Sequence, residues 1–383
     1  MIKADSGVHV LEKRDVQSLV DLFDSNKKEN VAIICHDQPD PDCLASAMAV
    51  KAIADFHGIK ASIYYGGEIP YTQNSVMMNV LNISAIKLEA DEGNEDESTQ
   101  QLKAALEQSY IIVVDTSCFF GKENNIGAFQ FIPKDKQPDL VIDHHAVNNA
   151  INCPYIHKSY GSCSTIMYEV LRELDISISK DLATGLYLGI STDTADLKSE
   201  GTTENDRVAL DELRKMMDVE ILRKIYDYPK PLALLELRKR AYNSYIICGN
   251  NLIIANVGII NPQQRALLAI LCEEILGIES VDSVMVIGVV DEGLEKPKFL
   301  ISSFRTQVLA INVSQFIHKV FGKKHGGGRR GAGASKVPLE QMLCSAIDFA
   351  KRQDADSLNP ASEIIGTLFS MYANRVKEEK NNI

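Results

Sequence analysis

Three short apolar segments of the chain each end at aspartate or histidine, and this repeated pattern is its strongest constraint on the fold. They are Val31–Cys35 before His36, Ile111–Val114 before Asp115, and Leu140–Ile142 before Asp143-His144-His145. A short apolar run bounded by polar residues is typical of a buried parallel strand. Ligands of open α/β sheets bind at the carboxyl ends of the strands. We therefore expect a doubly wound, mostly parallel sheet whose strand ends bring these polar side chains together.

The first segment leads into an acidic motif, His36-Asp37-Gln38-Pro39-Asp40-Pro41-Asp42. So many carboxylates share one cleft only if cations neutralise them. A single aspartate after a strand, such as Asp115, is more often a turn or cap residue, but three matching strand ends favour a dinuclear metal site. Mixed carboxylate and imidazole ligands suit Mn²⁺, with Mg²⁺, Co²⁺, Zn²⁺ and Fe²⁺ as alternatives. Two ions about 3.5–4 Å apart would hold the attacking and leaving oxygens of a phosphoryl displacement.

Four motifs of the chain, in order, resemble those of the DHH phosphoesterase superfamily. They are His36-x-x-x-Asp40-x-Asp42, the isolated Asp115, Asp143-His144-His145, and Gly189-Ile190-Ser191-Thr192-Asp193-Thr194. The segments Ser303–Thr306 and His325–Ala334 look like the C-terminal DHH-associated domain. The layout is similar to nanoRNases, 3'-phosphoadenosine 5'-phosphate phosphatases and linear-dinucleotide phosphodiesterases. The resemblance implies two α/β domains with the active site in the cleft between them.

The resemblance also implies a role for each motif residue. The implied ligands are His36 and Asp40 for one ion, Asp42, His144 and Asp193 for the other, and Asp115 as the bridge. A water between the ions would become hydroxide near neutral pH and act as nucleophile. His145 would donate to a phosphate oxygen or the leaving group, and Asp143 would orient an imidazole. Asp193, at the end of a segment that favours a helix from Leu182 to Ile190, has a capping role as its alternative, and Asp196 is the alternative ligand.

A basic segment interrupts an otherwise acidic chain. Lys323 to Arg330 contains four Lys or Arg residues and three glycines, whereas the chain has a net charge of −12. That charge argues against binding long duplex nucleic acid; a Gly-rich loop with basic residues instead fits a small phosphorylated ligand. A solvated surface loop is the alternative, and the resemblance favours substrate binding. The substrate-binding residues so predicted are His145, Arg305, His325, Gly326, Gly327, Gly328, Arg329 and Arg330. The family loop places its histidine after the glycines, whereas His325 precedes them here.

The length of 383 residues predicts two domains. We expect a catalytic metal-binding domain at 1–225, a linking helix at 226–245, and a smaller α/β substrate-binding domain at 246–383. The eight cysteines are scattered, without a Cys-x-x-Cys pair, which indicates a reducing compartment. No signal peptide or membrane span is evident, so we expect a cytoplasmic protein without a membrane partner; whether it forms a homodimer stays open.

These observations leave three functions in two classes. The leading one is a phosphodiesterase that hydrolyses short oligonucleotides or linear dinucleotides, such as pGpG or pApA, to mononucleotides through a two-metal activated hydroxide. The enzymatic alternative is a phosphomonoesterase acting on 3'-phosphoadenosine 5'-phosphate, or a pyrophosphatase or exopolyphosphatase. A nucleotide-binding sensor is the non-enzymatic alternative, which the complete ligand set disfavours.

Overall fold

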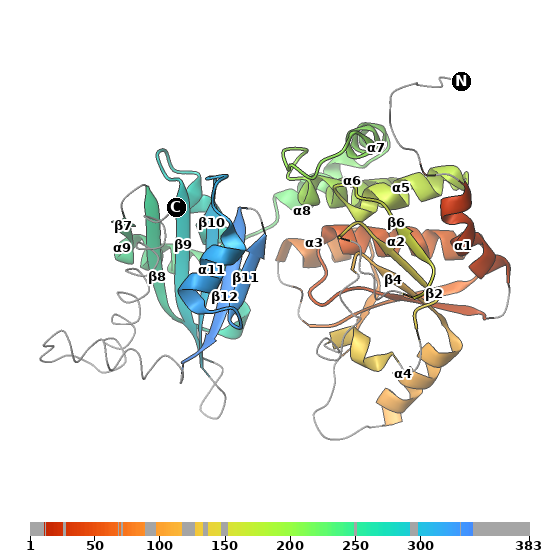
Figure 1. Cartoon of the computed structure of the whole chain (residues 1–383), viewed down its shortest axis with the longest axis horizontal. Coiled ribbons are helices and arrows are strands. Elements are labelled where there is room, and N and C mark those ends of the chain that lie inside the picture. The colour runs from red at the N-terminus through yellow and green to blue at the C-terminus, as the bar shows by residue number, and fades with distance from the viewer. Residues whose placement is uncertain are drawn as a thin grey trace, which may run out of the picture. The chain divides into compact units, whose positions relative to one another are not determined.

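The structure, a computed structural model, describes residues 11, 13–25, 28–67, 69, 72–88, 97–116, 127–132, 137–146, 152–248, 251–291, 298–329 and 331–339. The chain divides into two compact units, Met1–Tyr228 and Pro229–Ile383. Each unit contains a six-stranded sheet with helices. The expected two-domain α/β class is confirmed (Figure 1).

The first unit is built on a parallel sheet. Its strands are β1 (Asn30–Ile34), β2 (Lys60–Tyr65), β3 (Ala85–Lys87), β4 (Tyr110–Val114), β5 (Leu140–Asp143) and β6 (Tyr155–His157). Their order is β3-β2-β1-β4-β5-β6, and every neighbouring pair is parallel. Chain order reverses at β1, so β1 and β4 flank the switch point where such sheets bind ligands.

Helices cover both faces of this sheet, which explains why its central strands are continuous apolar runs. The helices are α1 (Lys13–Asp24), α2 (Pro41–Phe56), α3 (Thr72–Val80), α4 (Glu97–Gln108), α5 (Cys163–Glu173), α6 (Lys180–Asp193), α7 (Glu204–Arg214) and α8 (Val219–Tyr226), with a short 3₁₀ helix at Gly127–Phe131. Ile33 packs in the core with α2, α5 and α6, whereas its neighbour Ile34 packs on the other face with α4. Figure 1 shows α4 on the opposite side of the sheet from α2 and α5.

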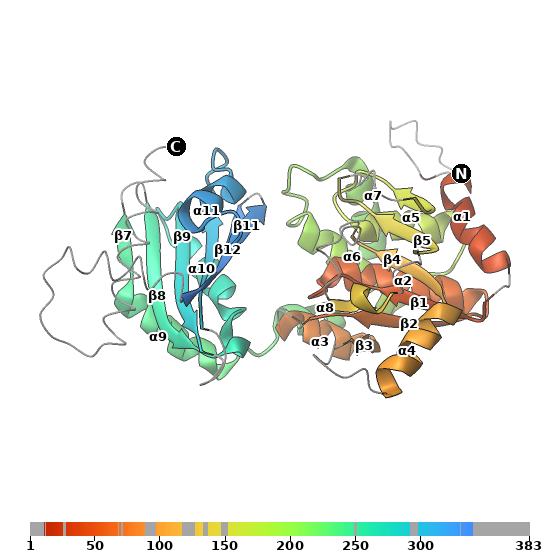
Figure 2. The same ribbon diagram turned by 60° about the horizontal axis from the view of Figure 1, so that its bottom comes forward.

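The second unit has a mixed sheet. Its strands are β7 (Ile246–Cys248), β8 (Leu252–Ile260), β9 (Ser283–Val290), β10 (Phe299–Thr306), β11 (Gly326–Arg329) and β12 (Ala332–Pro338), in the order β11-β12-β10-β9-β8-β7. Only β8 and β9 pair in parallel among these strands. Helix α11 (Val313–Phe321) packs on one face, and α9 (Leu232–Ser244) and α10 (Leu267–Leu276) pack on the other. Figure 2 shows this three-layer arrangement. None of the helices that the structure describes is long and apolar enough to cross a bilayer.

Helix α9 is part of the second unit. The sequence predicted it as a link between domains, but its buried residues Leu234, Leu237 and Ala241 share a core with Ile253 of β8. The division between the units accordingly falls before α9, after Tyr228.

The glycine-rich segment forms a strand, which corrects the expectation of a loop. Gly326 to Arg329 is β11, at the sheet edge and antiparallel to β12. A Cβ at Gly326 would lie 2.9 Å from Ile317, and one at Gly328 would lie 2.6 Å from Val313, both on α11. The glycines therefore let α11 pack closely on this hairpin, which the sequence alone did not reveal.

Candidate metal centre and active site

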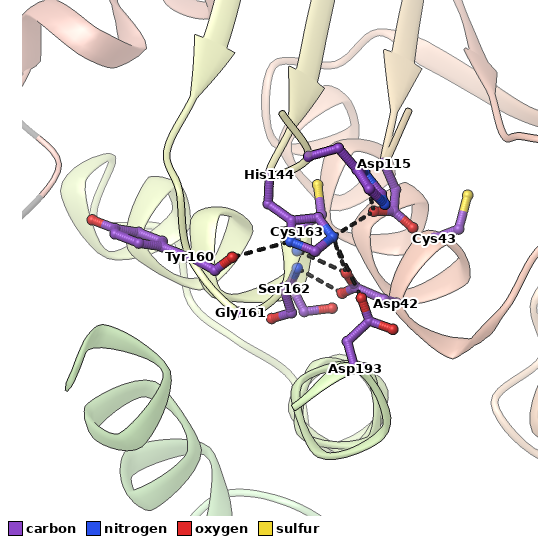
Figure 3. Close-up of polar contacts among 12 residues, drawn as sticks. Asp42, Cys43, Asp115, His144, Tyr160, Gly161, Ser162, Cys163 and Asp193 are labelled. Atoms are coloured by element: carbon purple, nitrogen blue, oxygen red, sulfur yellow. Dashed lines mark hydrogen bonds and ion pairs between the residues drawn. The ribbon is translucent and has the colours of Figure 1, made fainter. Parts of the chain in front are cut away.

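The carboxyl ends of three adjacent strands bring the predicted site residues of the first unit together. Because β1, β4 and β5 are neighbours in a parallel sheet, His36, Asp115 and the Asp143-His144-His145 motif emerge at one edge. Two helix ends complete the cluster: α2 starts after Asp40, and α6 ends at Asp193. Figure 3 shows Asp42, Asp115, His144 and Asp193 converging on one place.

Asp115 lies at the centre of the cluster. Its backbone is in the left-handed region, with φ 59, which aspartate tolerates better than most residues. Its Oδ2 lies 3.6 Å from His36 Nε2, and its Oδ1 lies 3.4 Å from His144 Nε2. The carboxylate is only 2% exposed, yet Oδ1 has no hydrogen-bond partner among the described residues. Burial alone would raise its pKa, but the contacts with His144 and His36 lower it to about 2.

The two flanking histidines each use Nδ1 on the backbone and direct Nε2 toward carboxylates. His36 Nδ1 lies 2.8 Å from the Asp37 carbonyl, and His144 Nδ1 lies 3.1 Å from that of Tyr160. A carbonyl only accepts, so Nδ1 carries a proton and, in the neutral ring, Nε2 presents a lone pair. The buried Nε2 of His144 has no hydrogen-bond partner in the described part of the chain. Lone pairs facing carboxylates repel each other unless a cation lies between them.

Asp42 is held by the start of helix α5. Its two oxygens accept N–H groups of Cys163 and Ser164, each at 2.7 Å, and the side chain is fully buried. Its Oδ2 also lies 3.8 Å from His144 Nε2. The positive end of the α5 dipole therefore fixes this carboxylate beside the cluster.

Helix α6 carries Asp193 to the cluster because Gly189 permits a close approach to α2. A Cβ at Gly189 would lie 2.2 Å from Ser164 Oγ and 3.1 Å from the Cα of Asp42. Asp193 Oδ2 consequently lies 3.4 Å from His144 Nε2. The expected helix from Leu182 to Ile190 is confirmed. The alternative Asp196 lies beyond α6 and binds the Ser191 hydroxyl instead.

Asp40 caps helix α2. Its Oδ1 accepts the backbone N–H of Cys43 at 3.0 Å and lies 3.9 Å from His36 Nε2. Asp40, which the resemblance implied as a ligand beside His36, is thus both a helix cap and a member of the cluster.

His145 differs from His144 in its partners and exposure. Its Nδ1 lies 2.7 Å from Asp143 Oδ1, and its side chain is 54% exposed, whereas Asp143 is fully buried. The hydrogen bond to Asp143 raises the pKa of the His145 imidazole. Tyr155 donates to the other carboxylate oxygen of Asp143. Asp143 therefore orients His145, which can donate a proton toward the open side of the site.

The electrostatics of the cluster fit divalent cations. Burial and the charges of Asp115 and Asp193 raise the pKa of the Asp42 carboxyl, and burial with the charge of Asp115 raises that of Asp40 to about 6. Burial lowers the pKa of His144, but contacts with Asp115 and Asp193 and the charge of Asp42 outweigh it and raise the pKa to about 12. Protons and metal ions compete for such groups, so an arrangement that favours protonation also favours cations.

Three groups of side chains in the described residues have ligand atoms within 4.8 Å of one another. They are His36 with Cys43 and Asp115, Asp115 with His144 and His145, and Asp42 with His144 and Asp193. Cys43 was not among the metal ligands predicted from the sequence, which favoured a packing role for it close to the metal site. The sequence also attached no role to Asp206, which accepts the Gly161 N–H at 2.8 Å and the Thr165 hydroxyl at 2.6 Å, and so fixes the turn before α5.

The described substrate-binding residues that were predicted in the second unit lie on or next to strands β10 and β11. Arg305, on β10, donates to Glu273 at 3.2 Å and to the Phe304 carbonyl at 3.1 Å. His325 precedes β11 and is half-buried, and Gly326 to Gly328 lie in that strand. Of Arg329 only the backbone is described, and Arg330 lies outside the described residues.

Residues 30–190, which contain every residue of the cluster except Asp193, match the model of the DHH family, N-terminal domain. This match places the first unit of the chain in the DHH phosphoesterase superfamily. The fold agrees: an exopolyphosphatase-related protein from Bacteroides fragilis superposes with a TM-score of 0.65 at 14% identity, covering 97% of this chain and 99% of that one.

Two relatives are similar to this chain over most of its length. An uncharacterized protein of Methanocaldococcus jannaschii is 30% identical over 318 residues, which are 82% of this chain and 59% of that protein, so the chain spans about three fifths of that relative's length. A probable manganese-dependent inorganic pyrophosphatase of Listeria welshimeri is 24% identical over 71% of this chain and 81% of its own.

Proposed function

We propose that the protein is a divalent-cation-dependent hydrolase of phosphoric ester or anhydride bonds, with the cluster around Asp115 as its active site. The observation that carries this proposal is the pair of histidines, His36 and His144, whose Nδ1 atoms are fixed by backbone carbonyls while their Nε2 atoms face buried Asp115. Metal-ligating histidines almost always have this arrangement, in which the second ring nitrogen donates to a carbonyl or carboxylate.

The residues divide into those that would hold cations and those that would act on the substrate. We assign His36 and Asp40 to one ion, Asp42, His144 and Asp193 to the other, and Asp115 to both. Two Mn²⁺ ions, when bound, would supply Lewis-acid stabilisation and lower the pKa of a water molecule toward neutrality. Mg²⁺ and Co²⁺ are the alternative ions.

His145 would serve the substrate directly. Its protonated ring, oriented by Asp143 through the 2.7 Å hydrogen bond, can donate to a phosphate oxygen or to the leaving group. Its exposure supports this role because a ligand of the buried centre would be expected to be enclosed like His144, which is 11% exposed. In the second unit, we assign binding of the remote phosphate or nucleotide to Arg305 and to the segment from His325 to Arg330.

We favour short oligonucleotides or linear dinucleotides such as pGpG and pApA as substrates, hydrolysed to mononucleotides. The basic segment Lys323 to Arg330 in an acidic chain supports a small anion with more than one phosphate or nucleotide. A second candidate, inorganic pyrophosphate, is favoured by the similarity to the Listeria pyrophosphatase over 71% of the chain. 3'-Phosphoadenosine 5'-phosphate is the substrate of the phosphomonoesterase alternative.

One substrate panel tests these alternatives. The purified protein with Mn²⁺ would be given pGpG, pApA, 3'-phosphoadenosine 5'-phosphate, a cyclic dinucleotide, longer RNA and pyrophosphate, and the kcat/KM values would be ranked. Fastest release of mononucleotides from the linear dinucleotides supports the phosphodiesterase, whereas fastest turnover of pyrophosphate selects the second candidate. If the protein binds nucleotides but turns over none of these substrates, the hydrolase proposal is refuted and the nucleotide-binding sensor is supported.

A further inference from the structure

We infer that the sulfur of Cys43 is an additional metal ligand on the His36 side of the centre, so that this site is suited to thiolate-accepting ions such as Zn²⁺, Co²⁺ or Fe²⁺. The inference rests on the metal centre of the proposed function. It deepens that proposal, because the types of ligand determine which ions the site prefers. Cys43 is fully buried in the first turn of α2, one residue after Asp42.

The geometry of the thiol supports ligation. The ligand atoms of His36, Cys43 and Asp115 lie within 4.8 Å of one another. Two ligand atoms of one tetrahedral zinc ion, at bond lengths of 2.0–2.3 Å, lie about 3.6 Å apart. Small side-chain adjustments would therefore close this group on a single ion.

Two neighbours of Cys43 already point to a ligand in the same space. In the neutral ring, the Nε2 of His36 presents a lone pair, because Nδ1 donates to the Asp37 carbonyl. Asp115 is 2% exposed, and its Oδ2 lies 3.6 Å from this Nε2 atom, so a lone pair and a buried carboxylate oxygen face each other on this side of the cluster. Figure 3 shows the Cys43 side chain beside that carboxylate. The thiol thus borders a site that independent atoms identify as incomplete.

The role of Asp40 leaves room for the sulfur. Its Oδ1 is engaged as the cap of α2, on the N–H of Cys43 itself, at 3.0 Å. It lies 3.9 Å from His36 Nε2, and it is absent from the three close ligand groups that the described residues form. The cap holds Cys43 in place, so the same turn presents a carboxylate and a thiol to one ion.

The alternative is that Cys43 only packs. Its Sγ lies 3.8 Å from the Val114 carbonyl, a weak contact that a packing thiol would also make. Cys163 is a matched comparison: it is fully buried beside the same cluster, its Sγ lies 3.6 Å from the Ile142 carbonyl, and it belongs to none of the three ligand groups in the described region. If Cys43 is a ligand, replacing its sulfur should change the bound metal, whereas replacing the sulfur of Cys163 should not. The two thiols are equally buried, so burial alone would not produce this difference.

The experiment uses Co²⁺ as a spectroscopic probe in the full-length protein. Bound cobalt is measured after dialysis, and the near-ultraviolet spectrum reports a sulfur-to-cobalt charge-transfer band if a thiolate is bound. We expect the band in the wild type and in Cys163→Ser, and its loss in Cys43→Ser with the visible cobalt bands retained. Competition should show the Zn²⁺-to-Mn²⁺ affinity ratio falling at least tenfold in Cys43→Ser, because thiolate favours zinc over manganese.

Each outcome decides a separate question. Cobalt bound to the wild type without the charge-transfer band overturns thiolate ligation and leaves the proposed function standing, and this result needs no variant. A band that persists in Cys43→Ser also overturns it. If the wild type binds neither Co²⁺ nor Mn²⁺, the proposed metal centre falls as well. Should Cys43→Ser unfold, as circular dichroism would show, Cys43→Ala replaces it in the comparison.

Discussion

His145 Nδ1 lies 2.7 Å from Oδ1 of Asp143, the residue that ends β5. The adjacent His144 instead places Nδ1 3.1 Å from the Tyr160 carbonyl and directs Nε2 into the cluster. Two consecutive histidines thus face different surroundings because different groups orient their rings. One is enclosed among carboxylates, and the other faces the open side of the site.

The first prediction separates these two histidines. His144→Ala should lose bound metal and activity together, because it removes an imidazole that faces Asp42, Asp115 and Asp193. His145→Ala should keep most of the metal and lose turnover by roughly 10²–10⁴-fold, the usual contribution of a positioned proton donor. Metal content by elemental analysis and kcat are the measurements. Equal metal loss in both variants would contradict the assignment.

The second prediction concerns Asp115. Asp115→Ala should abolish hydrolysis of every substrate and lower the metal content, because no other carboxylate contacts both His36 and His144 in the described residues. Wild-type protein should be stabilised by added Mn²⁺, by about 4 kcal/mol per site at a thousand times the dissociation constant. Thermal unfolding with and without chelator measures this difference. A variant that turns over like the wild type would rule out the bridging role.

The third prediction tests how α6 positions Asp193. Gly189→Ala should destabilise the first unit by about 1–3 kcal/mol and reduce metal binding, since its Cβ would lie 2.2 Å from Ser164 Oγ and 3.1 Å from the Cα of Asp42. Gly185→Ala is the matched control on the same helix, because its Cβ would meet the flexible end of Met48 at 3.2 Å. Urea unfolding and metal content are the readouts. Indistinguishable behaviour of the two variants would refute the close-approach argument.

The sequence predicted the parallel sheet and the convergence of its strand ends because burial on both faces leaves a plain apolar signature. The apolar run from Ile111 to Val114 is typical of an interior strand. The end of this strand places Asp115 beside the ends of the neighbouring strands β1 and β5. Residues that act through their backbone groups leave no comparable signature in the sequence. Neither the Tyr160 carbonyl, which orients His144, nor the Cys163 N–H, which holds Asp42, follows from side-chain type.

Glycine explains the error in the second unit. A run such as Gly326-Gly327-Gly328 is typical of a loop, because glycine has no intrinsic preference for a strand. Here the strand is set by pairing with β12 and by the missing Cβ atoms that let α11 approach. Only tertiary packing distinguishes the two cases. Cys43 was not predicted as a ligand for a related reason: a buried cysteine is usually a small apolar residue, and only the folded chain shows how close its sulfur lies to His36 and Asp115.

The last prediction tests substrate binding by the second unit. Arg305→Ala, and separately Arg329→Ala with Arg330→Ala, should weaken binding of a dinucleotide by about 1.5–3 kcal/mol, the value of a charge-assisted hydrogen bond. That corresponds to a loss of roughly ten- to a hundredfold in kcat/KM. The small ester bis-p-nitrophenyl phosphate has no second nucleotide to be held, so its hydrolysis should stay nearly unchanged.

Glu273→Gln is the matched control for this prediction. Arg305 donates to Glu273 at 3.2 Å, so Arg305→Ala also removes an ion pair within the second unit. Glu273→Gln removes the same ion pair but keeps the guanidinium, and it should retain or improve dinucleotide turnover. If Glu273→Gln loses as much activity as Arg305→Ala, the arginine serves the fold rather than the substrate. If Arg305→Ala lowers the turnover of the small ester equally, its effect is not specific to the remote nucleotide, and the assignment fails.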